Sequence, residues 1–178
     1  MTITTDAETA TTRMTDTGLL ILRIATGATM LQAGLIKAFD FGTAVGFMES
    51  SGWRFPAFGA FMVTAAETLG GIGLLLGALT PLAACAVIGA MVDAWAVNVS
   101  ADAFWSQPFN VPFLAAFAAA ALLFTGAGAF SVDHRVFGRS KVSAKAAVGL
   151  LVIGVAAAVV TWIALNGTNP IHVTSPTG

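Results

Sequence analysis

Charged residues are scarce in this sequence: it has 8 Lys and Arg and 9 Asp and Glu among 178 residues. A soluble domain carries about a quarter charged residues, and it needs enough polar residues to cover its surface. Here 57% of residues are hydrophobic and the mean hydropathy is +0.85. An ordinary soluble globule and a disordered chain are both excluded, and the lipid bilayer is predicted to be the main solvent.

Cysteine and histidine are nearly absent as well. The single cysteine, Cys85, cannot form an intrachain disulfide, and no Cys/His cluster predicts a metal site. His134 and His172 both lie outside the apolar runs, which excludes a bis-His haem within the membrane. A net charge of −1 gives no support for nucleic-acid binding. The sequence also lacks the P-loop, GxSxG and HExxH motifs of common enzyme classes.

Long apolar runs dominate the remainder of the chain. Each is close to the roughly 20 residues that a helix needs to cross a bilayer, and only helices satisfy their own backbone in lipid without closing a barrel. An all-α membrane protein is therefore predicted. The five expected spans are residues 18–39, 57–79, 82–99, 111–130 and 146–165.

The ends of these spans carry recognisable capping residues. Thr80-Pro81 is expected to cap the third span and to supply its first-turn proline, which makes a tight hairpin with the second. Pro112 opens the fourth span, and Asn166-Gly167 closes the fifth. Segment 40–56 is too polar to span. It fits either a helix lying flat on the membrane interface or a surface loop.

The N-terminal residues 1–17 are polar and lack the basic start and cleavage site of a signal peptide. We expect residues 1–15 to be disordered and Asp16 and Thr17 to cap the first span. Cations in loops set membrane orientation. They place the N-terminal tail in the cytoplasm and the C-terminal tail, 166–178, outside. The basic residues on the cytoplasmic side are Arg13 and, in the loop 135–145, Arg135, Arg139, Lys141 and Lys145.

Four ionisable residues fall within the spans: Arg23, Lys37, Glu67 and Asp93. Each costs roughly 2.5–3.5 kcal/mol at mid-helix, so each needs a partner or water. At about 1.5 Å per residue, Glu67 lies within reach of the Arg23 side chain. We therefore predict an Arg23–Glu67 pair with Asp93 in the same interior, and Lys37 extending to the outer edge without a partner. Such a pair either locks the bundle or handles protons or a ligand.

Small residues accompany these charges at helical spacing. Because residues three and four apart share a helix face, another helix can approach closely along such a stripe. Cys85 is either a small buried residue or a redox group. The stripes are Arg23, Gly27, Met30, Gly34 and Lys37 on the first span; Glu67, Gly70, Leu74 and Gly77 on the second; and Cys85, Gly89 and Asp93 on the third.

Three stretches, Leu19–Phe41, Ala66–Ala94 and Gly126–His134, resemble the DoxX family. The first stretch is similar to the family's first helix, with its arginine and closing G-x-x-K. The second is similar to its Glu-x-x-Gly-Gly helix, the Leu-Thr-Pro hairpin and the acidic helix that follows. The third is similar to its Ser-x-Asp segment. The resemblance implies a four-helix inner-membrane bundle over 18–134, with the fifth span, 146–165, beyond it. The implied polar set is Arg23, Lys37, Glu67, Asp93 and Asp133, with motif glycines Gly34, Gly70, Gly71 and Gly77.

Relatives in that family include a membrane subunit of a thiosulfate:quinone oxidoreductase. The leading hypothesis is a subunit of a quinone-linked redox complex, related to thiol, sulfur or oxidative-stress chemistry, in a bacterial-type plasma membrane. Its own chain would hold no cofactor, and its partners would be the bilayer and a membrane-bound redox protein. The intramembrane charges would contact quinone or carry protons. A non-catalytic scaffold or assembly factor is the main alternative, and a small proton-linked transporter is the third.

Overall fold

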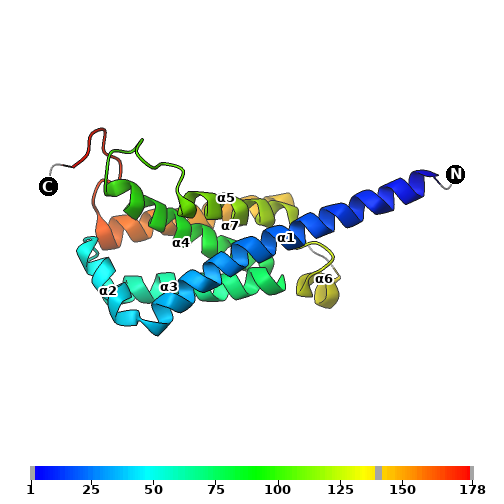
Figure 1. Cartoon of the computed structure of the whole chain (residues 1–178), viewed down its shortest axis with the longest axis horizontal. Helices are drawn as coiled ribbons and strands as arrows, with labels where there is room; N and C mark the ends of the chain where they lie inside the picture. Colours follow the sequence, from blue (N-terminus) through cyan, green and yellow to red (C-terminus); the bar gives the residue numbers. More distant parts are fainter. Residues whose placement is uncertain (1–2, 139–141, 177–178) are drawn as a thin grey trace.

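A computed structural model describes residues 3–138 and 142–176, and all its regular elements are helices. Figure 1 shows an elongated bundle in which the N-terminal part of α1 extends beyond the other helices. Arg139 and Lys141, two of the cations used for the predicted orientation, lie outside the described residues. The elements are α1 (Ile3–Phe39), α2 (Phe41–Ser50), α3 (Pro56–Leu76), α4 (Thr80–Ser100), α5 (Val111–Thr125), α6 (Val132–Phe137), α7 (Ala144–Thr161) and a π-helical turn η1 (Trp162–Asn166).

Four of the described helices are long and apolar enough to cross a membrane: α1 from Ala10, α3, α4, and α7 continued through η1. The fourth predicted span is shorter than expected, because α5 ends at Thr125 rather than near residue 130. Gly126 has a φ of 85°, which stops the helix there. With 15 residues, α5 is about 22 Å long, less than the roughly 30 Å of a hydrocarbon core.

The N-terminal prediction was wrong. The structure places helix from Ile3 onward, and neither Asp16 nor Thr17 caps it. No glycine or proline interrupts residues 3–17, so nothing in this stretch stops the helix from continuing. The Thr17 hydroxyl donates to the Arg13 carbonyl one turn earlier. The Asp16 carboxylate instead accepts a hydrogen bond from the Ala129 N–H, far along the chain.

The helix ends around the α3–α4 hairpin are formed differently from the prediction. The N-cap of α4 is Leu79, which has a φ of 49° and whose own side chain makes no capping hydrogen bond. The Thr80 hydroxyl is buried with no partner among the described residues. Proline in the first turn of α4 and of α5 is confirmed, as is the end of the last helix at Asn166-Gly167. Residues 41–50 form helix α2, so this part of segment 40–56 is helical rather than a simple loop.

Glycines bring α1 and α3 into close antiparallel contact. A Cβ atom added at Gly34 would lie 2.6 Å from the Thr68 nitrogen, and one at Gly71 would lie 2.5 Å from the Leu31 nitrogen. A Cβ atom added at Gly70 would lie 2.7 Å from the Val87 side chain of α4. The predicted close-packing role of these glycines is confirmed. They are used within the chain, so these glycine faces are not free for a partner protein.

The buried apolar side chains form two clusters at opposite ends of the bundle. One contains Leu74, Val87 and Leu122 and joins α3, α4 and α5. The other contains Met48, Trp53 and Trp162 and lies beside α2. Helix α7 packs along α4 (Figure 1).

Candidate functional site

Lys37 of α1 and Glu67 of α3 form an ion pair inside the bundle, with 2.7 Å between Nζ and Oε2. The Glu67 side chain is 4% exposed and that of Lys37 is 29% exposed. Lys37 also donates to the Ala33 carbonyl of its own helix. This pairing corrects the prediction that Lys37 extends outward alone. Because Gly34 lies against Thr68, the next turn of α1 carries Lys37 to the level of Glu67.

Arg23 does not pair with Glu67. Its guanidinium is buried, 1% exposed, and donates only to main-chain carbonyls among the described residues. These are Leu74 O at 3.1 Å and Leu75 O at 3.3 Å in the last turn of α3, and Ala127 O at 2.6 Å and Phe130 O at 2.9 Å. The last carbonyls of a helix have no partner within it and carry partial negative charge, so a cation suits this position. Arg23 therefore ties α1 to the end of α3 and to segment 126–131.

Asp133 complements Arg23 at the same end of the bundle. Its carboxylate oxygens accept hydrogen bonds from the N–H groups of Leu79 (2.7 Å) and Thr80 (2.9 Å), so Asp133 caps α4 from a distant part of the chain. Its own N–H donates to Gly77 O. A Cβ at Gly77 would lie 2.7 Å from Arg23 Nη1, and the φ of Gly77 is 63°. Arg23, Gly77 and Asp133 thus serve the fold.

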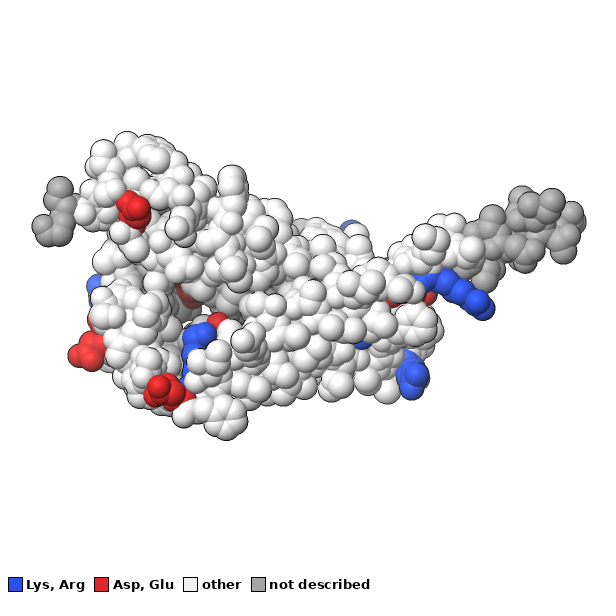
Figure 2. Space-filling view, in the orientation of Figure 1, with Lys and Arg blue, Asp and Glu red and all other residues white. Residues whose placement is uncertain are grey.

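A cavity of about 640 Å³ contains the other three members of the predicted polar set: Lys37, Glu67 and Asp93. Figure 2 shows a hollow in the surface near α2, with acidic and basic side chains inside it. The rest of the lining is mostly apolar and includes four methionines, Met30, Met48, Met62 and Met91. Oppositely charged side chains from different helices therefore do meet, as predicted, but the cation that pairs with Glu67 is Lys37 and not Arg23.

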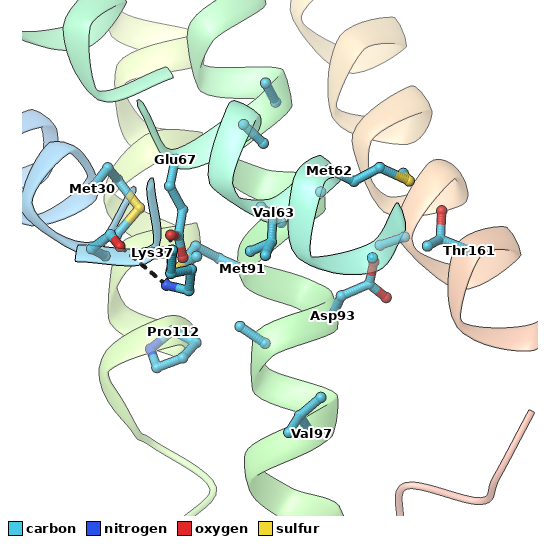
Figure 3. Close-up of a pocket in the computed structure, with 18 of the residues that line it drawn as sticks. Met30, Lys37, Met62, Val63, Glu67, Met91, Asp93, Val97, Pro112 and Thr161 are labelled. Carbon is cyan, nitrogen blue, oxygen red and sulfur yellow. Dashed lines mark hydrogen bonds and ion pairs between the residues drawn. The ribbon is translucent and has the colours of Figure 1, made fainter. Parts of the chain in front are cut away.

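Lys37, Glu67 and Asp93 lie on two sides of the cavity. Figure 3 shows Lys37 and Glu67 together on one side, with Asp93 on the other, near Thr161 of α7. The Oδ1 atom of Asp93 is buried and has no hydrogen-bond partner among the described residues. Cys85 also lines the cavity, and its thiol donates to the Leu150 carbonyl at 3.2 Å.

Sequence reasoning missed two contributors to this cavity. Trp53 lines the cavity and is 7% exposed, and its indole N–H has no partner among the described residues. Its ring packs edge-on against that of Trp162, with 6.1 Å between the ring centroids. The other contributor is α7, which supplies Thr161 and Gly154. In sequence, a tryptophan indicates at most a residue suited to a membrane interface, and α7 was predicted only as an apolar span. Within the described residues, no three His, Cys, Asp or Glu side chains are grouped to hold a metal.

Comparison with protein families places this geometry in context. The family model described as DoxX matches residues 18–101, which include α1 from Gly18 and all of α2, α3 and α4. The ion pair and Asp93 lie within the matched segment, whereas α5, α6 and α7 follow it. No curated protein and no solved structure gave a match.

Proposed function

This chain is a DoxX-family membrane protein, and on that premise we propose that its intramembrane cavity binds the head group of a lipid-soluble quinone. The chain then serves as the membrane subunit of a redox complex, in which a partner protein oxidises a thiol or another reduced sulfur compound and passes its electrons to the quinone. The observation that carries this proposal is the Lys37–Glu67 pair, enclosed with Asp93 in one apolar cavity.

The size and chemistry of the cavity suit such a ligand. Ligand pockets typically have volumes of about 300–1,000 Å³, with apolar walls and a few polar groups that orient the ligand, and this cavity of about 640 Å³ falls within that range. Methionine side chains adapt to irregular ligand shapes and make favourable contacts with flat rings. Four of them line these walls, so the ring and the first part of a hydrocarbon tail have suitable surroundings.

The polar groups have distinct roles in this proposal. The Lys37 ammonium carries three donors; two are used by Ala33 O and Glu67, which leaves one for a ligand oxygen. When bound, a quinone takes up two electrons and two protons to become a quinol. The Glu67 carboxylate, held by Lys37, accepts or returns a proton at that ligand oxygen. General acid–base groups placed in this way contribute about 100-fold or more to a rate.

The same proposal includes a location and an orientation. The chain resides in a bacterial-type plasma membrane, with its N-terminus in the cytoplasm. Supporting this orientation, Arg135 lies in α6 between α5 and α7, and Lys145 lies in the first turn of α7; cations at such positions favour the cytoplasmic side.

Glu67→Gln tests the proposed function, because it keeps the size of the side chain and removes its charge. In the complex purified in lipid, we expect quinone-dependent turnover to fall about 100-fold. The control is Glu49→Gln on the exposed surface of α2, which should leave turnover unchanged. Unchanged turnover and unchanged quinone affinity in Glu67→Gln would contradict a direct role for the cavity.

A scaffold or assembly function is the second candidate, and one observation favours it. Arg23 and Asp133 belong to the polar set that the DoxX resemblance implies, and their hydrogen bonds hold helix ends together. Capture of partner proteins after mild solubilisation separates the two candidates. A constant oxidoreductase partner supports the redox subunit, whereas a varied set of partners supports the scaffold.

A further inference from the structure

Helix α7 follows the segment that matches the DoxX model, yet it forms part of the cavity wall. Its contribution comes from one half of the helix, residues 153–161, and consists of Ile153, Gly154, Ala157, Ala158 and Thr161. The cavity of this chain is therefore enclosed with the help of a helix that lies outside the matched segment.

Glycines set the distance between α7 and α4. A Cβ at Gly154 would lie 2.9 Å from the Cys85 carbonyl oxygen, and one at Gly89 would lie 3.3 Å from the Gly154 carbonyl oxygen. Asp93 is one helical turn after Gly89 on α4. Along the same pair of helices, Thr161 of α7 lies on the Asp93 side of the cavity (Figure 3). The close contact thus positions α7 as the cover over Asp93.

Asp93 presents an unused hydrogen-bond acceptor to this part of the cavity. A buried polar atom without a partner is unfavourable, and in native structures such atoms call for an explanation. The other charged groups that line the cavity are Lys37 of α1, Glu67 of α3 and Asp40, the N-cap of α2; α5 and α7 contribute none to the described lining. Lys37 is already paired with Glu67. A bound molecule in the cavity is therefore a candidate source of the donor that Asp93 Oδ1 lacks among the described residues.

We propose that Asp93 and α7 form a hydroxyl-binding subsite, in which the carboxyl group accepts a hydrogen bond from an O–H group of a lipid-soluble ligand. This inference rests on the proposed function, where the reduced form, a quinol, supplies that O–H group. Lys37 on the opposite side donates to a ligand oxygen whether or not that oxygen carries hydrogen. The cavity therefore binds both a ligand with a free hydroxyl group and the analogue in which that group is an ether, and the subsite makes it prefer the ligand with the hydroxyl group.

Two probes isolate this hydrogen bond: a benzohydroquinone with a decyl chain and its dimethyl ether. Their dissociation constants are measured with the purified full chain in lipid nanodiscs. For the unaltered protein we expect the hydroquinone to bind about tenfold more tightly than the ether, the ratio that one hydrogen bond of this strength provides. In Asp93→Leu, which removes the acceptor at similar size, the two probes should bind equally.

A matched pair of substitutions tests the part played by α7. Gly154→Leu forces α7 away from Cys85 and should abolish the preference for the hydroquinone, whereas Gly149→Leu, where a Cβ meets nothing within 4 Å, should preserve it. Only protein that is folded and still binds the ether enters the comparison.

The outcomes of these measurements distinguish the inference from the proposed function. Equal binding of the two probes to the unaltered protein, or a preference that survives Asp93→Leu, overturns the subsite and leaves the quinone cavity standing. A preference that survives Gly154→Leu overturns the role of α7. No binding of either probe to the unaltered protein contradicts both proposals.

Discussion

Arg23 is a buried cation that contacts no carboxylate among the residues that the structure describes. Its hydrogen bonds run to four main-chain carbonyls, two at the end of α3 and two in segment 126–131. A planar guanidinium with five donors can reach several acceptors at once, which a lysine ammonium on its flexible stem cannot do in the same geometry. At the scale of single residues, this side chain ties the middle of α1 to the end of α3 and to the segment that follows α5.

We predict that Arg23→Met destabilises the protein by about 3 kcal/mol or more, because hydrogen bonds to a charged group contribute about 1.5–3 kcal/mol each and the carbonyls lose their donors. The measurement is thermal unfolding in detergent, followed by circular dichroism. Arg135→Met is the control, because Arg135 is exposed on α6. Equal unfolding temperatures for the two variants would show that the Arg23 hydrogen bonds do not hold the fold.

At the scale of elements, the contact between α1 and α3 depends on the absence of side chains. Gly34 and Gly71 lie where any Cβ would meet main-chain atoms of the other helix. Main chain cannot move aside as a flexible side chain can, so the two helices would have to separate. That separation would also pull Lys37 away from Glu67, which links helix packing to the geometry of the cavity.

Gly34→Ala is therefore predicted to destabilise the fold by about 1–3 kcal/mol, the usual cost of overpacking. Gly46→Ala is the matched control in α2, where an added Cβ meets nothing within 4 Å. The control should be neutral or slightly stabilising, since alanine is the better helix former. Chemical denaturation in mixed micelles measures both. A Gly34→Ala variant as stable as its control would contradict the close contact.

Much of the helical architecture could be predicted from sequence, because lipid requires helices and the apolar runs give their lengths. The α1–α3 packing could also be predicted, since the glycines recur at helical spacing. The sequence did not allow us to predict which group each charged side chain pairs with. The depth argument placed Arg23 within reach of Glu67, but depth does not fix the relative positions of two helices along their axes. The Gly34–Thr68 contact sets that position and brings Lys37 to Glu67 instead.

The capping of α4 was equally inaccessible to sequence reasoning. Asp133 lies more than 50 residues after Leu79, the residue whose N–H it accepts. Local capping patterns favoured Thr80, whose hydroxyl has no partner among the described residues. A cap supplied from a distant segment follows from the tertiary fold, and no local pattern contains that information.

At the scale of the whole molecule, the polar residues divide into two groups. Arg23 and Asp133 fix helix ends at one end of the bundle, and Lys37, Glu67 and Asp93 line a cavity nearer to α2. The hydrogen bonds of the first group go to the protein's own main chain. The second keeps hydrogen-bonding capacity unused, which is the property that a ligand site requires. This division is what connects the fold to the proposed function.

The central claim is that opposite charges on α1 and α3 meet inside the cavity, and exchanging them tests it most directly. Lys37→Glu and Glu67→Lys should each destabilise the protein in lipid nanodiscs. The double exchange should recover about 1 kcal/mol or more relative to the sum of the single changes, as interacting residues do. Effects of the two single changes that simply add in the double variant would contradict the pairing and, with it, the proposed site.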